Sequence, residues 1–184
     1  MNMMTGKALA PAGTGRLGLR KPTAEDGAEV WQLIRACEPL DENSMYCNLL
    51  QCDHFADTCV LAEMNGEVVG WVSGYIVPSA PDTLFVWQVA VDGRTRGMGV
   101  AKKMLTHLLD REVCADVSKL QTTITADNEA SWALFNAFAE RRDAPVEHEP
   151  HFEREAHFDG AHATEYMLTI GDFGAEPERK DRAA

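Results

Sequence analysis

The amino-acid sequence predicts a single α/β domain, with a mixed β-sheet flanked by helices. Segments with the spacing of strands and segments with the spacing of helices alternate along most of the chain. No internal repeat or long linker divides them, and 184 residues is a usual size for one domain. Hydrophobic residues make up 45% of the chain and charged residues 25%, so a packed core can form without disulfides or a structural metal.

The first quarter of the chain reads as a short strand followed by two helices. Residues 17–20 have strand character, and Thr23 with Asp26 three positions later resembles a capping box that starts a helix. Apolar residues at i, i+3, i+4 and i+7 give this helix one buried face, made of Val30, Leu33, Ile34 and Cys37. Pro39 is expected to end it, and residues 44–55 are expected to form the second helix.

The next segment is rich in strands. Residues 58–64 and 67–77 are expected to pair as a hairpin, because the Asn65-Gly66 dipeptide between them is the preferred two-residue turn. Pro78 and Pro81 are expected to mark the turn that follows.

The remaining elements alternate between strand and helix. Residues 84–91 are almost continuously apolar, which is typical of a central strand buried on both faces. After it we expect a loop over 93–99, a helix over 100–113, a strand over 120–125, a helix over 128–142 and a last strand over 164–170. The domain should therefore span residues 16–171, between a disordered arm at 1–15 and a frayed tail at 172–184.

Charge and cysteine content narrow the range of functions. The chain has 17 basic and 29 acidic residues, and a net charge of −12 repels phosphate backbones, so no nucleic-acid partner is expected. No apolar run is long enough to cross a bilayer, and no secretory signal is recognisable, so no membrane partner is expected either. The five cysteines are odd in number and include no C-x-x-C pair, which favours reduced thiols in the cytoplasm.

The most informative motif is Arg94-x-x-Gly97-x-Gly99, which stands between the apolar strand and a helix. Glycines allow a tight turn and close approach of a ligand, and the start of a helix attracts anions. Arg94, Arg96, Lys102 and Lys103 make this the one notably basic stretch of an acidic chain. The pattern favours an anionic cofactor such as a pyrophosphate, and a simple glycine turn with solvated charges is the alternative. Residues 13–18 match the dinucleotide fingerprint, but no strand leads into them.

This strand, loop and helix resemble the acetyl-CoA site of the GCN5-related N-acetyltransferases. The resemblance implies acetyl-CoA as co-substrate, no metal, and a set of contacts to the cofactor: Val89, Ala90, Val91, Arg94, Thr95, Arg96, Gly97, Met98, Gly99, Val100, Ala101 and Asn128. Asn128 could equally be a helix N-cap. The family often has a tyrosine seven residues further on, as the acid for the leaving thiolate, and this chain has Phe135 there. Trp132, Phe135 and Phe138 are interpreted as core residues.

Four blocks, at residues 40–50, 86–91, 123–128 and 162–168, resemble more narrowly the L-2,4-diaminobutyrate acetyltransferases of ectoine biosynthesis. That resemblance implies acetyl transfer to the γ-amine of diaminobutyrate, by a cytoplasmic homodimer. The residues expected to bind the substrate are Asp41, Tyr46, Trp87, His162 and Glu165, with Glu165 and Tyr46 in catalytic roles.

Alternatives remain open at several of these positions. Asp41 could serve only to cap a helix, and Tyr46 and Trp87 could be core residues. His162 and Glu165 are three residues apart, so both reach one site only if a bulge or turn lies between them.

The function and the histidine-rich region also leave alternatives. The enzyme could act on another polyamine, amino acid or protein lysine, or the chain could be an acyl-CoA-binding sensor without turnover. A loose His148-x-x-His151 pattern could suggest a metal, but a solvated or dimer-edge loop is the expected state of this stretch.

Overall fold

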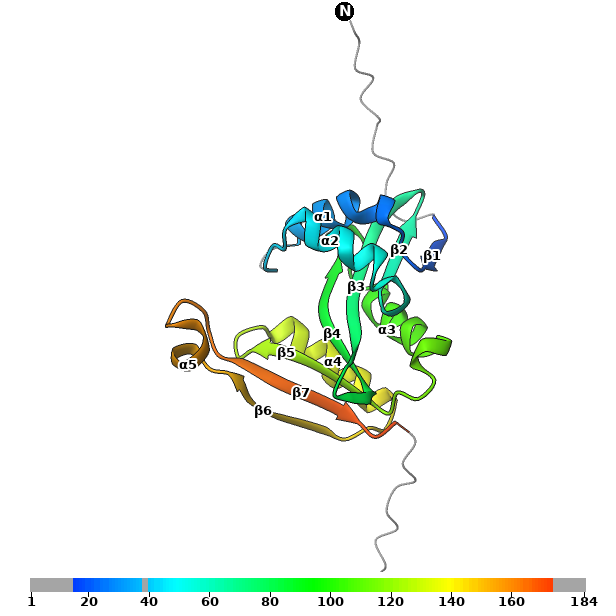
Figure 1. The fold of residues 1–184 in the computed structure, drawn as a ribbon. Coiled ribbons are helices and arrows are strands. Elements are labelled where there is room, and N and C mark those ends of the chain that lie inside the picture. The colour runs from blue at the N-terminus through cyan, green and yellow to red at the C-terminus, as the bar shows by residue number, and fades with distance from the viewer. Residues whose placement is uncertain (1–14, 38–39, 174–184) are drawn as a thin grey trace, which may run out of the picture.

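The structure, a computed structural model, describes residues 15–37 and 40–173. The arm at 1–14, Pro39 and the tail from 174 lie outside the described residues, so the expectations for them are not examined. Seven strands form one sheet in the order β1-β2-β3-β4-β5-β7-β6 (Figure 1). The strands are β1 (Leu17–Arg20), β2 (Val60–Met64), β3 (Glu67–Val77), β4 (Ala80–Val91), β5 (Lys119–Thr125), β6 (Val146–Phe152) and β7 (Glu165–Gly171). The helices are α1 (Gly27–Arg35), α2 (Met45–Asp53), α3 (Val100–Leu109), α4 (Glu129–Arg141) and α5 (Arg154–Phe158).

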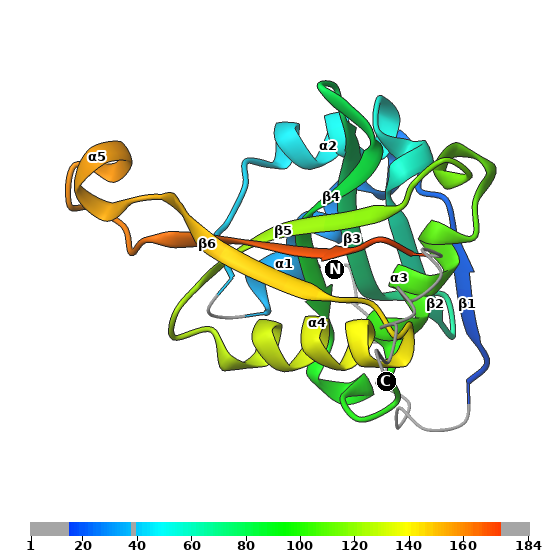
Figure 2. The same cartoon turned by 90° about the horizontal axis from the view of Figure 1, so that it is seen from below.

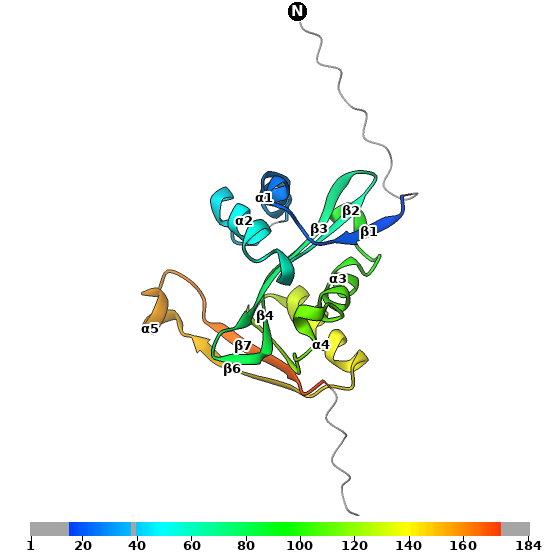
Figure 3. The same cartoon turned by 45° about the vertical axis from the view of Figure 1, so that its right-hand side comes forward.

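The sheet opens at its centre. Neighbouring strands are antiparallel except β4 and β5, which run parallel and pair only through Thr83–Phe85 and 119–121. Beyond this short ladder the two strands separate, as Figures 1 and 3 show. Among the residues that the structure describes, no strand pairs with this edge of β4 from residue 86 onward, so its backbone polar groups there are available to another molecule.

Helices cover both faces of the sheet and form two separate hydrophobic clusters. Residues of α3 and α4, such as Met104 and Phe135, pack with the sheet in the larger cluster. The buried face predicted for the first helix is present, because Val30, Leu33 and Ile34 pack with Trp71 in the smaller cluster. Figure 3 shows α1 and α2 on one side of the sheet and α3 and α4 on the other.

Several local signals act as the sequence predicts. Asn65 and Gly66 have φ of 56° and 76°, as a tight hairpin turn requires, and they join β2 to β3. Asn128 caps α4 through the Ser131 amide. The cap of α2 is Ser44, whose side chain accepts a hydrogen bond from the Cys47 amide, so the alternative that Asp41 caps this helix is wrong. The Asp26 carboxylate accepts from the Thr23 backbone N–H, although the first turn there is a 3-10 turn.

Strand β4 differs from the prediction at its start and at one residue of its apolar run. It begins at Ala80 rather than at 84, and Pro81 lies inside it, at an irregularity where Ile76 pairs with Leu84 but Val77 with Ala80. A proline fits there because the ladder is already interrupted. The apolar run is buried on both faces as predicted, with Val86 in the larger cluster and Ala90 in the smaller one, except at Trp87, which is 50% exposed.

Trp87 is exposed because it is the extra residue of a β-bulge. Ser73 pairs with Gln88 and the adjacent Gly74 pairs with Val86, so Trp87 has no partner on β3. Gly74 is needed at this point, since a Cβ there would lie 2.7 Å from the carbonyl oxygen of Phe85.

The prediction is also wrong after residue 142. Residues 146–152 form strand β6 rather than a loop, and α5 follows it. All seven residues of β6 are exposed, including Pro150 in the middle, so no apolar alternation marks it as a strand. Figure 2 shows β6, α5 and the start of β7 projecting from the body as an arm. Helix α3 is four residues shorter than expected, and β2 begins two residues later. Within the described ranges, no helix is long and apolar enough to span a membrane.

Candidate active site

The loop between β4 and α3 has the geometry of an anion site. Gly97 and Gly99 have φ of 79° and 69°, a region that favours glycine, and no atom lies within 4 Å of a Cβ built on either. The amide of Lys103 is the first in α3 to reach a helical acceptor, the carbonyl of Gly99. The amides of Val100 and Ala101 precede it and have no acceptor within the helix, so they can donate to a bound anion.

The basic residues of this region fall into two groups. The guanidinium of Arg94 is held by Asp92 at 2.7 Å and by Glu67 at 3.0 Å, and these carboxylates raise its pKa. Arg94 is thus occupied by partners from its own chain. Lys102 and Lys103 instead line a groove of about 820 Å³, together with Arg141 of α4.

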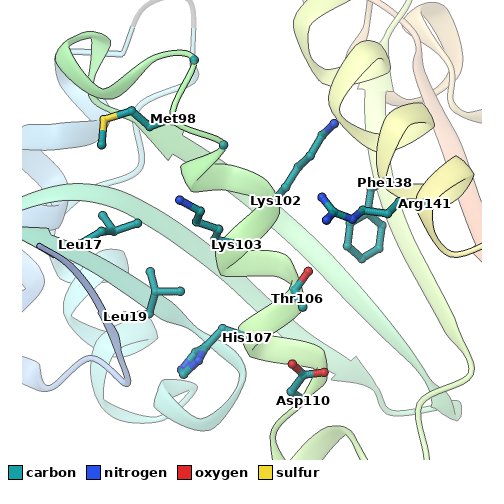
Figure 4. Close-up of a pocket in the computed structure, with 12 residues that line it drawn as sticks. Leu17, Leu19, Met98, Lys102, Lys103, Thr106, His107, Asp110, Phe138 and Arg141 are labelled. Atoms are coloured by element: carbon teal, nitrogen blue, oxygen red, sulfur yellow. The ribbon is translucent and has the colours of Figure 1, made fainter.

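Figure 4 shows how this groove is built. Lys102 from α3 and Arg141 from α4 point into the space between the two helices, while Lys103 lies on the side of Leu17. Gly97, Met98 and Gly99 border the same groove, so it continues from the anion loop. Sequence reasoning missed Arg141, because its place beside α3 depends on how α4 packs.

A second, acidic pocket of about 580 Å³ lies at the carboxyl end of β5. It is lined by Leu40, Asp41, Thr125, Asp127, Asn128, Glu129, Ala130, His162, Ala163 and Glu165. Three of the five predicted substrate residues, Asp41, His162 and Glu165, therefore come together here from two separate parts of the chain. Asn128 lines the pocket as well as capping α4, so its two interpretations are compatible.

The centre of this pocket is a histidine between two carboxylates. The Nε2 atom of His162 lies 3.5 Å from Asp41 Oδ2 and 4.0 Å from Glu165 Oε1. Its Nδ1 atom is 2.8 Å from the carbonyl oxygen of Ala163. His162 belongs to the turn before β7, which begins at Glu165, so the turn required by their spacing is present.

The electrostatics of the pocket favour proton transfer. Burial raises the pKa of Glu165 above its usual range, although the His162 charge and the Thr123 hydroxyl oppose this. The backbone carbonyl of Ala163 raises the pKa of His162, and the charges of Asp41 and Glu165 add to that effect. A carboxylate with a raised pKa accepts a proton more readily at neutral pH.

The two predicted aromatic residues lie outside the lining of this pocket. Tyr46, in the first turn of α2, is 68% exposed, and Trp87 at the bulge is half exposed. The alternative that they are core residues is therefore wrong. Phe135 and Phe138 are buried as expected, and Trp132 is half-buried, with its indole N–H donating to the carbonyl of Thr125.

The cysteines offer no nucleophile. All five are free, and burial raises the pKa of each thiol, to about 12 for Cys52 and Cys59. Thiolate chemistry at neutral pH is therefore disfavoured. Within the residues that the structure describes, no group of three or more His, Cys, Asp or Glu side chains is arranged to hold a metal ion.

Comparison with known proteins identifies the fold. Residues 27–139 match the family model described as the acetyltransferase (GNAT) family. The chain belongs to this family. Among solved structures, this GNAT chain resembles Ard1 from Thermoplasma volcanium with a TM-score of 0.66 and 16% identity, covering 84% of this chain and 97% of that one. At that identity the likeness concerns the fold alone.

Much more similar relatives also exist within the GNAT family. An L-2,4-diaminobutyric acid acetyltransferase from Methylotuvimicrobium alcaliphilum is 50% identical over 157 residues, which are 85% of this chain and 91% of the relative. One from Bordetella parapertussis is 46% identical over 168 residues, 91% and 90% of the two chains. The structure of diaminobutyrate acetyltransferase EctA from Paenibacillus lautus, in complex with its substrate L-2,4-diaminobutyric acid and coenzyme A, matches with a TM-score of 0.84. It is 41% identical, and the match covers 89% of this chain and 99% of that one.

Proposed function

We propose that this GNAT chain transfers the acetyl group of acetyl-CoA to the γ-amine of L-2,4-diaminobutyrate, the acetylation step of ectoine biosynthesis. The observation that carries the proposal is the likeness, at 41% identity and nearly full length, to a diaminobutyrate acetyltransferase in complex with that substrate and coenzyme A. The acidic pocket supplies the chemical reason, because diaminobutyrate carries two ammonium groups that carboxylates attract.

The anion loop and the adjoining groove fit acetyl-CoA. The amides before Lys103 and the two glycines with positive φ can receive the pyrophosphate, and the backbone of Val89, Ala90 and Val91 borders the gap beside β4. Lys102, Lys103 and Arg141 add positive charge for a further phosphate. When bound, acetyl-CoA supplies an activated acetyl thioester.

The carboxylates of the acidic pocket hold the amine and take its proton. An alkylammonium group has a pKa of roughly 10.4, so at pH 7 about one molecule in a few thousand is the free nucleophile. Glu165 is the proposed base, because burial raises its pKa and it lines the pocket at the mouth of the gap. Asp41 and His162 orient the substrate beside it.

The proton donor for the leaving thiolate must differ from the tyrosine that is common in the family. Phe135 stands at that position, is buried in the core and has no hydroxyl group. Tyr46 has an exposed hydroxyl at the start of α2, on the side of the sheet from which Asp41 also comes, and is the proposed donor. Trp87 is proposed to wall the substrate site from the bulge of β4.

We further propose a homodimer in the cytoplasm, with residues 16–171 as the catalytic domain. The exposed strand β6, with Val146 and Phe152 on its surface, offers an edge that a second copy could cover. Five unpaired cysteines suit a reducing compartment. Light scattering coupled to gel filtration measures the oligomeric state, and a monomer at micromolar concentration would exclude the dimer.

The decisive experiment follows coenzyme A release with a panel of amines. Diaminobutyrate should give steady turnover, with acetylation at the γ-nitrogen seen by NMR of the product. Ornithine and diaminopropionate, one methylene longer and shorter, should react about 10- to 200-fold more slowly. If the α-acetyl product dominates, or a protein lysine reacts faster than diaminobutyrate, the substrate assignment is wrong. Absence of turnover with every amine would favour an acyl-CoA sensor.

A further inference from the structure

The bulge at Trp87 changes the face of the sheet on which Gln88 lies. Without the bulge, Gln88 would lie on the opposite face. Val86 is buried in the cluster with α3 and α4. In a regular strand Gln88, two residues later, would point the same way. The extra residue reverses this alternation, and Ala90 accordingly packs in the cluster with α1 and α2. Gln88 lies on that second face with only 8% of its surface exposed.

Both ends of the Gln88 amide are bonded to the segment between α1 and α2. Its Nε2 atom donates to the backbone carbonyl of Asp41 at 2.9 Å, and its Oε1 atom accepts from the Asn43 side-chain amide at 3.2 Å. A carboxylate here could not donate, and an apolar side chain could make neither bond. This position therefore uses a property that only an amide side chain of this length supplies.

The segment has few other strong attachments among the described residues. The Asp41 carboxylate is 88% exposed, so its contact with His162 is screened by solvent and holds it weakly. The pair between Arg35 and Glu42 is 3.3 Å long, with both side chains about half exposed, and is weak for the same reason. Leu40 packs against the smaller cluster and its amide donates to the Cys37 carbonyl, which secures the start of the segment. The buried amide of Gln88 supplies the hydrogen bonds that join Asp41 and Asn43 themselves to β4.

Asp41 and Glu165 reach the acidic pocket from opposite sides of the gap in the sheet. Glu165 is fixed by β7, which pairs with β5, whereas Asp41 is fixed through Gln88 to β4. His162 bridges them at 3.5 Å and 4.0 Å. The position of the Asp41 segment thus sets the span between two carboxylates that attract the two ends of a diamine.

We infer that Gln88 is a positioning residue that sets the length of diamine accepted, by holding the Asp41–Asn43 segment over the pocket. This inference rests on the proposed function. It assigns Gln88 no contact with the substrate and no part in the proton transfer; the residue acts through Asp41.

The test compares Gln88→Met, which keeps the size but removes both hydrogen bonds, with a matched control. Gln121→Met is the control, because Gln121 is a half-buried glutamine on β5 that bonds a side chain, Thr169, away from the pocket. We expect Gln88→Met to raise the KM for diaminobutyrate about tenfold, the size expected for two hydrogen bonds of ordinary net strength. The KM for acetyl-CoA should stay within twofold, and the preference for diaminobutyrate over ornithine should shrink. Gln121→Met should change none of these.

Hydrogen–deuterium exchange gives a readout that does not depend on the substrate. Amides of residues 40–44 should exchange faster in Gln88→Met than in Gln121→Met. If the unaltered enzyme fails to acetylate diaminobutyrate, the proposed function is wrong. The exchange rates still test whether Gln88 holds the Asp41–Asn43 segment in place.

Other outcomes overturn the inference. An unchanged KM and amine preference in Gln88→Met would do so, even with faster exchange, because the segment would then be held without consequence for the substrate. An equal rise in the KM for diaminobutyrate and the KM for acetyl-CoA would show that Gln88 contributes only to the general stability of the fold. Should Gln88→Met not fold, Asn43→Ala removes one of the two bonds from the loop side, and it should raise the KM for diaminobutyrate about threefold with the same loss of preference.

Discussion

Replacing Glu165 by Gln should abolish most of the activity while leaving the fold intact. The variant keeps the size of the side chain and removes its charge and its ability to accept a proton. Two unit charges 4 Å apart attract by about 4 kcal/mol at an effective dielectric constant of 20. The Glu165 side chain is 18% exposed and the pocket opens to solvent, so we take about half of that, roughly 2 kcal/mol or 30-fold in substrate affinity.

Loss of the base adds to this effect on binding. A positioned general base contributes typically 10²- to 10⁴-fold, so kcat/KM for diaminobutyrate should fall by about 10³-fold or more. The pH dependence of coenzyme A release gives a second test of Glu165 as the base. The acidic limb of the pH profile should lie above the usual carboxyl pKa in the unaltered enzyme, because burial raises the pKa of Glu165, and this limb should disappear in the variant.

The thermal stability of Glu165→Gln distinguishes a catalytic role of Glu165 from a structural one. A carboxyl whose pKa is raised by folding binds more protons in the folded state, so its contribution to stability falls as pH rises from the unfolded pKa through the folded one. Above the folded pKa that loss is complete, and there Glu165→Gln should melt no lower than the unaltered protein. Activity within threefold of the unaltered enzyme would refute the reasoning. Asp41→Asn should lose activity less, since its carboxylate is 88% exposed.

Three further predictions concern the cofactor site and the fold. Gly99→Asp places a negative charge at the start of α3 and should weaken acetyl-CoA binding at least tenfold in calorimetry; unchanged affinity with intact circular dichroism would contradict the placement. Arg141→Ala should weaken acetyl-CoA binding severalfold, and raised salt should reduce the difference, whereas Arg154→Ala on the projecting arm should not affect it. Arg20 lowers the pKa of Asp26 to about 2, so this pair should contribute at most about 2 kcal/mol above pH 4, lost as pH falls toward 2. Urea unfolding of Asp26→Asn should accordingly show a deficit at pH 7 that shrinks at pH 3, and an equal deficit at both would exclude the ion pair as its cause.

The sequence predicts best those features that depend on adjacent residues. The Asn65-Gly66 hairpin, the Asn128 cap and the glycine loop before α3 all follow from local backbone chemistry, and the structure has each of them. Strand β6 was missed because all seven of its residues are exposed, so the only signal of an edge strand is its pairing with β7.

Features of the site that depend on distant residues could not be predicted in the same way. Trp87 is exposed because of the register between β3 and β4, which no pattern within β4 reveals. Arg94 fits the expected loop motif, yet Glu67, which binds it, lies in another strand. The meeting of Asp41 with His162 joins residues more than a hundred positions apart. The sequence therefore indicated which residues are candidates for the site, but it could not indicate which distant residues they contact.

The short parallel ladder between β4 and β5 has a thermodynamic consequence. The anion loop, the start of α3 and the Asp41 segment belong to the part of the chain before residue 110, whereas Asn128, His162 and Glu165 belong to the part after residue 119. In the described part of the chain, three residue pairs of the sheet join these parts, and α3 and α4 pack across them. Ligands that bind both parts therefore act as cross-links between them. Saturating acetyl-CoA at 100 times its dissociation constant should stabilise the fold by about 2.7 kcal/mol, and the amides of Thr83–Phe85 should then exchange more slowly.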